Sequence, residues 1–434
     1  MDVAVIAGII MIISVVVMLV MGVPIGISIG MSSALAMITI LPFGPGIVTC
    51  AQKMFTGVNS FSLLAIPFFI LAGNIMNNGG IARRLIRFAQ LLSGRIPGSL
   101  AHTNVLANMF FGALSGSAVA AASAIGGIMA PMEEEEGYDP AFATCVNIAS
   151  APTGLLIPPT SAFIVYSTVA GGVSVSALFM AGYVPGILMG LSTMAIAYCY
   201  AKKHNYPVCR KVSSSEAVRI TLDAIPSLLL IVIVIGGIVG GIFTATEGAG
   251  ICVLYCLILS LFYRSLTWKS FMKILLNSAA TSGIILFLIS ASSAMSWVMA
   301  YTGIPAAISN AIMSISTNKY IILLLMNLVL LVVGMFLDIT PACLIFTPIF
   351  LPIVQGLGMD LVQFGVVLTF NMCMGTMTPP VGSVLFVSCG ISKVPIERVF
   401  KPLLPYVGAL LIVLLLVTYV PAVSLAFPRL MGLV

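Results

Sequence analysis

Charge is scarce in this sequence. Only 7% of its 434 residues are charged, whereas 60% are hydrophobic and the mean hydropathy is +1.20. A soluble domain of this length needs a charged, hydrated surface, which this composition cannot supply. A bilayer core takes roughly 20 apolar residues per helix, and such stretches recur along the whole chain. We therefore expect an all-α polytopic membrane protein.

Motifs for enzymatic chemistry are also missing. Glycine is never followed by lysine, which excludes a P-loop, and HExxH does not occur. The only two histidines, His102 and His204, cannot build a zinc site, and the nine cysteines form no CxxC pair. The sequence therefore predicts no catalytic residue, no nucleotide and no transition metal. Basic residues confined to short loops do not suggest nucleic acid as a partner.

Apolar segments divide the chain into membrane spans and two hairpins. The predicted spans are 3–21, 24–41, 61–78, 140–170, 177–200, 219–242, 245–265, 279–301, 361–391 and 403–427. Two further segments, 98–131 and 318–352, are interrupted by Leu114-Ser115-Gly116-Ser117 and by Asp338-Ile339-Thr340-Pro341. These predict re-entrant hairpins, because non-helical backbone at membrane depth must be buried in protein or line a wet cavity. Two tightly turned full crossings are the alternative.

The two halves of the chain resemble each other. An offset of 221 residues relates Gly154 to Gly375, and the same offset relates Pro131, Gly137 and Asp139 to Pro352, Gly358 and Asp360. We therefore expect two repeats, residues 1–210 and 211–434. Each has five spans and one hairpin, so the second enters the membrane inverted, as is typical of secondary transporters.

The basic residues predict the orientation. With the N-terminus outside, fifteen of the 18 lysines and arginines lie inside, and only Lys53, Lys319 and Arg429 lie outside. The inside set is Arg83, Arg84, Arg87, Arg95, Lys202, Lys203, Arg210, Lys211, Arg219, Arg264, Lys269, Lys273, Lys393, Arg398 and Lys401.

Two short segments have their own interpretation. Ile81, Leu85, Phe88 and Leu92 predict the apolar stripe of an amphipathic helix that lies along the membrane plane. The alternative is a plain loop helix. The acidic run Glu133–Glu136 is expected to be a solvated cytoplasmic loop, because four adjacent carboxylates repel one another and hydrate well.

Matched breaks in two predicted spans, 140–170 and 361–391, are the candidate site. Proline and glycine free backbone carbonyls, and these carbonyls with nearby hydroxyls are hard ligands for an alkali cation. The expected sodium ligands are Ser115, Gly116, Ala151, Pro152, Thr153, Gly154, Asp338, Thr340, Gly375, Thr376, Thr378 and Pro379. A carboxylate within the membrane usually marks an ion path, so Asp338 is expected to bind the cation. Alternatively, Asp338 caps the helix that follows it.

Several motifs resemble the large membrane subunit of tripartite ATP-independent periplasmic (TRAP) transporters. They are Ile66–Asn74, Gly112–Ser117, Pro152–Thr160 and Gly375–Gly382. The resemblance implies sodium-coupled uptake of organic acids across a bacterial inner membrane by an elevator-type motion. It also implies two partners, a small four-helix membrane subunit as a separate chain and a soluble periplasmic binding protein.

Residues Ser115–Ala120, followed by Glu136–Phe142, resemble the sialic-acid branch of this family. Sialic acid is thus the expected substrate, with Ser115, Ser117, Thr160 and Ser161 as its binding residues. A permease for C4-dicarboxylates or another sugar acid, a stand-alone sodium/carboxylate symporter, a channel and a membrane-embedded enzyme are the alternatives. An enzyme would need an acid/base pair or a metal cluster that the sequence does not contain.

Overall fold

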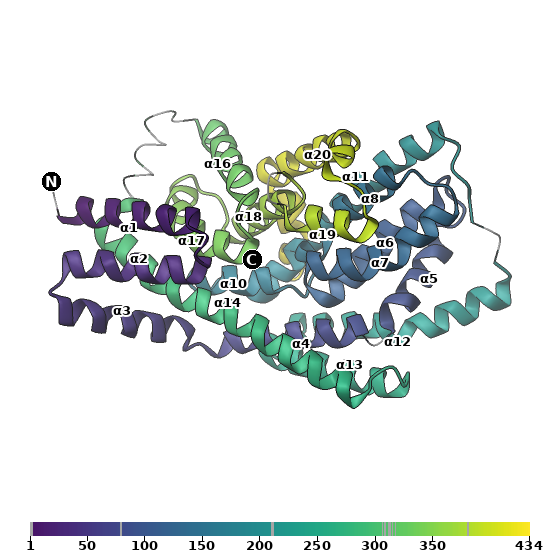
Figure 1. Cartoon of the computed structure of the whole chain (residues 1–434), viewed down its shortest axis with the longest axis horizontal. Helices are drawn as coiled ribbons and strands as arrows, with labels where there is room; N and C mark the ends of the chain where they lie inside the picture. The colour runs from purple at the N-terminus through teal and green to yellow at the C-terminus, as the bar shows by residue number, and fades with distance from the viewer. Residues whose placement is uncertain are drawn as a thin grey trace.

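A computed structural model of the chain describes residues 3–78, 80–209, 212–305, 318–379 and 382–434, and the isolated residues 307, 310, 314 and 316. Every element in this part of the chain is helical (Figure 1). Parts of the orientation and of the family resemblance rest on Met1, Asp2, Arg210, Lys211, Pro380 and Val381, which lie outside the described residues.

Six described helices are each long and apolar enough to cross a bilayer, and the number rises to eight if each of two bent pairs forms one span. Together with five shorter apolar helices, they make a polytopic membrane fold. The outer helices are α1 (Val3–Val20), α2 (Ile25–Ile40), α3 (Phe43–Val58), α4 (Ala65–Asn78), α12 (Ser214–Val239), α13 (Ala245–Phe262) and α14 (Trp268–Thr302), with the 3-10 turn η1 (Phe61–Leu64) before α4.

Two hairpins and two broken helices form the middle of the molecule. The first hairpin is α6 (Ser99–Ser115) with α7 (Ala118–Glu135), and the second is α16 (Lys319–Gly334) with α17 (Ile339–Gly356). The first broken helix comprises α8 (Pro140–Ser150), α9 (Thr153–Leu156) and α10 (Ser161–Val169), and the second comprises α18 (Leu361–Thr376) and α19 (Ser383–Ser392). The remaining helices are α5 (Ile81–Ser93), α11 (Val175–Lys203), α20 (Ile396–Tyr419) and α21 (Pro421–Leu430).

Three predicted boundaries were wrong. Residues 43–58 were expected to be a loop but form α3, which packs on α2 and α14; its glycines, Gln52 and Lys53 lower its hydropathy below that of a span. Lys269 and Lys273 lie on the first turns of α14, whose 35 residues extend about 52 Å. The last span is divided into α20 and α21, because Val420 is extended and Pro421 begins a new helix.

Residues that match at the offset of 221 have equivalent local roles. Asp139 Oδ1 accepts a hydrogen bond from Ala141 N at 3.2 Å and caps α8, as Asp360 Oδ1 accepts one from Val362 N at 2.7 Å and caps α18. Gly137 and Gly358, two residues before each cap, both have positive φ angles, 78° and 63°. Left-handed backbone of this kind favours glycine, so both turns depend on the residue type that the two halves share.

A close backbone approach also recurs in both halves. A Cβ added to Gly112 on α6 would collide with the backbone of Gly154 on α9, and one added to Gly375 on α18 would collide with the backbone of Gly334 on α16. In each half, therefore, a hairpin helix touches the broken helix through a pair of glycines. Only residues without a side chain allow backbones to approach so closely.

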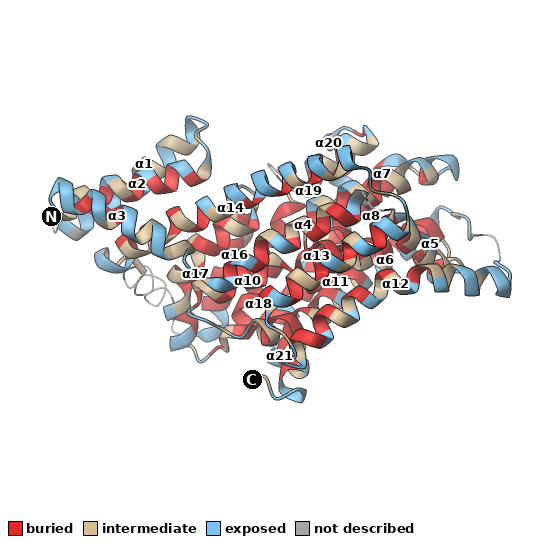
Figure 2. Cartoon of the chain, turned by 90° about the horizontal axis from the view of Figure 1, so that it is seen from below, coloured by how far each residue is buried: buried red, intermediate tan, exposed pale blue. Residues whose placement is uncertain are grey.

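The two halves interlock around the centre. The last segment of the first broken helix, α10, packs against α17 of the second hairpin, and α19 of the second packs against α7 of the first hairpin. Figure 2 shows the buried residues concentrated on these central helices, whereas α1, α2, α3 and α14 carry much exposed surface. The hairpin tips are thereby held inside the molecule, next to the breaks of the broken helices.

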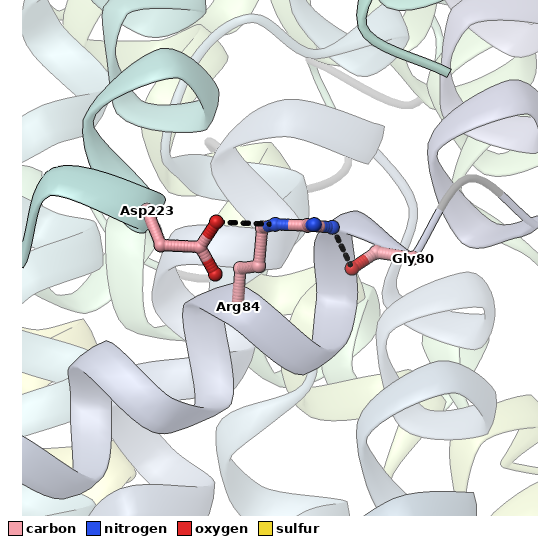
Figure 3. Close-up of polar contacts among 3 residues, drawn as sticks. All are labelled: Gly80, Arg84 and Asp223. Atoms are coloured by element: carbon pink, nitrogen blue, oxygen red, sulfur yellow. Dashed lines mark hydrogen bonds and ion pairs between the residues drawn. The ribbon is translucent and has the colours of Figure 1, made fainter. Parts of the chain in front are cut away.

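Helix α5 is fastened to the outer helices by Arg84. Its Nε donates to Asp223 Oδ1 of α12 at 2.9 Å, and its Nη1 donates to the carbonyl of Gly80 at 3.2 Å (Figure 3). The guanidinium also lies 3.5 Å from the ring centroid of Tyr263, which follows α13. The arginine thus links the start of α5 to two other helices through one charge pair and one cation–π contact.

The buried face of α5 differs from the predicted stripe. Ile81 and Leu85 are buried as expected, but Ala82, Ile86 and Ala89 complete that face, while Leu92 is 54% exposed. The next residue, Ser93, is buried against α6 with its hydroxyl 2.8 Å from the Thr103 hydroxyl, so Leu92 lies off the packed face. The helix is amphipathic, and its apolar side packs against protein.

The base of the first hairpin is closed by polar contacts. Tyr138, between α7 and α8, accepts a hydrogen bond from the backbone N of Leu100 at 3.3 Å, and burial raises the pKa of its phenol to about 12. The phenol therefore stays neutral at physiological pH. Tyr206 stacks on Tyr138 with ring centroids 4.3 Å apart, and the backbone N of Cys209 donates to the carbonyl of Gly94 at 3.0 Å. Both ends of the hairpin are thus joined to the chain that follows α11.

Candidate functional site

The hairpin tips and the helix breaks meet at one cavity of about 520 Å³, which we call the tip cavity. One wall comes from the first hairpin tip, Ser115–Ala120, and another from the second tip, Asp338–Thr340. The broken helices contribute Leu155, Ser161, Thr376 and Ser383, and helices α4 and α14 close the remaining side. The sequence placed both tips beside breaks, and the structure brings all four segments to this cavity.

The first hairpin tip is wedged between two backbones. Gly116 ends α6 with a φ of 61°, and a Cβ added to it would lie 2.9 Å from the carbonyl oxygen of Pro159. On the other side, a Cβ added to Gly73 of α4 would lie 3.1 Å from the carbonyl oxygen of Ser115. Ser115 is buried, and its hydroxyl has no hydrogen-bond partner among the described residues. A buried hydroxyl left in this state costs free energy, so it is available to a ligand.

The other three predicted substrate-binding hydroxyls differ in placement. Ser117 caps α7 by accepting a hydrogen bond from Ala120 N at 3.3 Å, and it still lines the tip cavity. Thr160 is fully buried and caps α10 through Ala162 N at 3.2 Å, so it lies behind the cavity wall. Ser161 is the first residue of α10 and faces the cavity. The structure therefore brings Ser115, Ser117 and Ser161 together and leaves Thr160 as a cap.

Residues 151–154 of the first break lie beneath the tip and do not line the cavity, whereas Leu155, directly after them, does. Ala151, Pro152, Thr153 and Gly154 are all buried. The Pro152 carbonyl accepts hydrogen bonds from Leu155 N at 3.0 Å and from the Cys373 thiol at 3.4 Å, which joins the two broken helices. The carbonyls of Ala151 and Thr153 likewise accept backbone hydrogen bonds, from Gly154 N at 3.1 Å and from Ile157 N at 2.8 Å.

The second break brings two backbone carbonyl oxygens close together. The sequence predicted that this break begins at Met374, but helix α18 continues through Thr376, so the break begins three residues later. The carbonyl oxygens of Thr378 and Thr376 converge on Gly382, where an added Cβ would lie 2.9 and 3.0 Å from them. Gly375 packs on Gly334, and Pro379 lies in the partly buried turn before the next segment.

Asp338 begins α17 at the position of a helix cap, but its side chain makes no capping hydrogen bond. Together with Thr340 it lines the tip cavity, and its side chain is exposed to that cavity. Among the described residues, no three His, Cys, Asp or Glu side chains gather into a metal-binding group. The oxygen atoms at the tip cavity are therefore hydroxyls, backbone carbonyls, amide oxygens and the Asp338 carboxylate, a set that suits hard monovalent cations.

Sequence reasoning missed the wall that faces the tips. Asn74 and Asn77 of α4 and Thr281 of α14 line the tip cavity, and Asn74 Nδ2 donates to Ser278 Oγ of α14 at 2.8 Å. Isolated polar residues on an apolar helix carry no spacing pattern, so only the rarity of asparagine within a span could have indicated them.

The acidic run was also interpreted incorrectly at one position. Glu133 was expected in a solvated loop, but it lies on α7 and is 1% exposed. Its Oε1 accepts a hydrogen bond from Asn104 Nδ2 of α6 at 3.1 Å. Helix α7 continues through Glu135 and turns this one carboxylate toward α6, whereas the other three carboxylates of the run are exposed.

Comparison with known proteins agrees with this arrangement. Residues 12–423 match the family described as the DctM component of tripartite ATP-independent periplasmic transporters. The chain is 54% identical to the uncharacterized protein YgiK of Salmonella typhimurium, with 92% of each chain covered. It is 39% identical to the C4-dicarboxylate TRAP transporter large permease DctM of Pseudomonas aeruginosa, covering 91% of this chain and 93% of that one.

Two further comparisons differ in what they support. The sialic acid TRAP transporter large permease SiaM of Vibrio cholerae is 36% identical, covering 92% of this chain and 93% of that one. The crystal structure of the YdaH transporter of Alcanivorax borkumensis superposes with a TM-score of 0.62, covering 86% and 88% of the two chains at 12% identity. At that identity the likeness extends to the fold alone. The chain belongs to the DctM family of TRAP transporter large permeases, multi-pass membrane proteins that take up organic acids and are not enzymes.

Proposed function

We propose that this chain is the large permease of a sodium-coupled uptake system for a sugar acid, with sialic acid as the substrate. One observation supports this most strongly. The tip cavity joins an unpartnered buried hydroxyl, on Ser115, to an uncapped carboxylate, on Asp338, and each lies at the tip of a different hairpin. Hydroxyls and the N-terminus of α10 suit an anionic substrate, whereas carboxylate and carbonyl oxygens suit a cation.

The proposed assembly follows the family. A separate four-helix membrane subunit and a soluble periplasmic binding protein work with the permease in the bacterial inner membrane. The N-terminus is periplasmic, so the base of the first hairpin is cytoplasmic and the base of the second is periplasmic. The two inverted repeats, 1–210 and 211–434, carry the tip cavity across the membrane in an elevator-type motion.

The relatives of this chain are named for different substrates, which are the alternatives to sialic acid. One relative, named for C4-dicarboxylates, is 39% identical, and another, named for 2,3-diketo-L-gulonate, is 34% identical. All these substrates are organic anions, which fits hydroxyl groups at a helix N-terminus equally well. Uptake of the candidate acids, measured side by side, identifies the substrate class as that of the acid with the highest uptake.

The test is uptake by reconstituted vesicles that contain the permease, the small subunit and the binding protein. Radiolabelled sialic acid should accumulate against its gradient when sodium is outside, and potassium or choline should not replace sodium. Uptake that runs only down the substrate gradient indicates a channel, and uptake without the binding protein indicates a stand-alone symporter. Accumulation of a C4-dicarboxylate in preference to sialic acid would reassign the substrate while preserving the mechanism.

A further inference from the structure

A second cavity, of about 220 Å³, lies at the base of the first hairpin, at the opposite end from its tip. We call it the base cavity. Helices α7 and α19 line both cavities. Helix α7 contributes Ser123 to the tip cavity and residues between Gly126 and Glu134 to the base cavity. Helix α19 contributes Ser383 to the tip cavity, and residues between Ser388 and Lys393, at its C-terminal end, line the base cavity. Because these two helices pack on each other, the two cavities lie along the same helix pair, with the base cavity nearer the base of the hairpin.

Asn147 of α8 forms the partition between the two cavities. Its Nδ2 donates to Ser388 Oγ of α19 and to the carbonyl of Ala122 of α7, both at 3.1 Å. The amide is pressed against Gly126, where an added Cβ would lie 2.5 Å from Nδ2. The side chain therefore bridges α7, α8 and α19 at the inner end of the base cavity.

A buried carboxylate lies in the wall of the base cavity. Glu133 is 1% exposed and has one hydrogen bond within the described chain, from Asn104. A buried carboxylate with so few partners is unfavourable unless it binds a proton or a cation. The other charged residues of the wall, Glu134 and Lys393, are exposed and of opposite sign, so Glu133 determines the charge inside.

A line of amides leads from Glu133 to the first break. Asn104 Oδ1 accepts a hydrogen bond from Asn108 Nδ2 at 2.8 Å, and Asn108 Nδ2 also lies 2.9 Å from Ser150 Oγ. The carbonyl of Ser150 accepts a hydrogen bond from the Thr153 hydroxyl at 2.6 Å. Asn108 is fully buried, and its Oδ1 has no partner among the described residues. An oxygen acceptor in this state needs a donor or a cation.

We propose that the base cavity binds a monovalent alkali cation, with the Glu133 carboxylate as its charged ligand, on the path by which the coupling cation leaves for the cytoplasm. The side-chain oxygens of Thr144, Asn147 and Ser392 supply further hard ligands. A single buried carboxylate balances one positive charge, whereas calcium sites use more carboxylates and six to eight oxygens. The cytoplasmic direction of this path rests on the function proposed above; the cation site itself does not.

The experiment uses a reporter cysteine in the base cavity. Gly127 lines the cavity, and a Cβ added to it meets nothing within 4 Å, so Gly127→Cys should be accommodated. The variant is made in a background without native cysteines and expressed with its small subunit. In inverted membrane vesicles, which expose the cytoplasmic face, the rate of labelling by N-ethylmaleimide is measured at constant ionic strength while sodium replaces choline.

Sodium should slow the labelling, by about tenfold when its concentration is nine times the dissociation constant. Glu133→Gln keeps the shape and the hydrogen bond from Asn104 but removes the charge, so it should abolish the protection. Glu135→Gln is the matched control, because Glu135 is on the same helix, is exposed and does not line the cavity. Its protection by sodium should equal that of the unsubstituted reporter.

Each outcome bears on the assignment. Labelling that ignores sodium in the reporter protein overturns the site, even if Glu133→Gln fails to fold. Labelling that ignores sodium, with a pH dependence that changes when Glu133 is replaced by glutamine, assigns Glu133 to a proton and likewise overturns the cation; the ionisation of the reporter thiol is common to both proteins. Sodium-independent uptake combined with sodium protection removes the proposed coupling but leaves the site. Sodium-dependent uptake without protection removes the site but leaves the coupling.

Discussion

At the scale of single residues, substitution of Asp338 is the most direct test of the proposed cation site. Asp338 is the only carboxylate in the wall of the tip cavity within the described chain. Asp338→Asn keeps the shape and removes the charge, so we expect the sodium concentration for half-maximal uptake to rise about tenfold or more. The half-saturating substrate concentration should change much less, because the loss falls on a cation ligand.

Initial uptake rates in reconstituted vesicles, measured while sodium and substrate are varied separately, check this expectation. A normal sodium dependence in Asp338→Asn would reduce the carboxylate to the cap position that it occupies at the start of α17.

Ser115 and Ser161 test the anion side of the same cavity. A hydrogen bond to a charged group contributes about 1.5–3 kcal/mol, so Ser115→Ala or Ser161→Ala should raise the half-saturating substrate concentration about tenfold or more. The Ser115 hydroxyl has no hydrogen-bond partner in the described part of the chain, so its removal should leave folding and assembly with the small subunit intact. Ser260→Ala is the control, because this buried hydroxyl of α13 also has no hydrogen-bond partner among the described residues and lies outside the tip cavity. Unchanged concentration dependence in both variants would exclude these serines from the site.

At the scale of helices and hairpins, the local sequence pattern predicted some elements and missed others. Gly116 ends α6 with left-handed backbone, which glycine adopts readily, and Pro152 cannot donate the backbone hydrogen bond of a continuing helix, so the sequence indicates both the tip and the break. Helix α3 was missed because its glycines and polar residues lower its hydropathy, and its packing on α2 and α14, which buries Gly46 and Cys50, is not visible in the local sequence. The local sequence pattern indicates where a helix ends, whereas tertiary contacts determine which of the more polar segments are helical.

The candidate site follows the same division. Ser115, Asp338 and Thr376 were found because they interrupt apolar segments, whereas Asn74 and Thr281 interrupt nothing and were missed. Glu133 was misjudged because repulsion among four adjacent carboxylates is a local argument, and its burial depends on Asn104, 29 residues away. Long-range pairing of this kind leaves no periodic signal in one sequence.

The paired glycines give a prediction about elements. In Gly112→Ala the new methyl group would meet the backbone of Gly154, which cannot move aside as a flexible side chain can. Overpacking of this type costs about 1–3 kcal/mol, so the thermal midpoint of the purified protein should fall. Gly236→Ala on α12 is the control, since nothing lies within 4 Å of the added Cβ. Its midpoint should stay the same or rise, because alanine favours a helix over glycine by about 1 kcal/mol. Equal midpoints for both variants would show that α6 and α9 tolerate separation.

At the scale of the whole molecule, the proposed orientation can be read from one exposed position. Ser214 is the first residue of α12 and is exposed, next to the basic residues assigned to the cytoplasm. With native cysteines replaced, Ser214→Cys should resist an impermeant thiol reagent applied to intact cells and react after the cells are permeabilised. Rapid labelling in intact cells would invert the topology and exchange the sides reached by the two hairpin bases and by the base cavity.

The charge carried in each cycle is a property of the complete transporter. Suppose that each half, with its hairpin tip and its break, holds one sodium ion, so that two ions accompany one singly charged acid and the cycle moves one net positive charge inward. At 100 mV one charge contributes about 2.3 kcal/mol, so an inside-negative potential of that size should raise steady-state accumulation by about 50-fold at fixed ion gradients. A potassium gradient with valinomycin sets the potential in reconstituted vesicles, and accumulated radiolabel gives the ratio. Accumulation that ignores the potential means an electroneutral cycle with a single sodium ion. Since the two hairpins are built alike around the glycine pairs Gly112–Gly154 and Gly334–Gly375, that result would mean that equivalent architecture in the two halves does not carry equivalent cation sites.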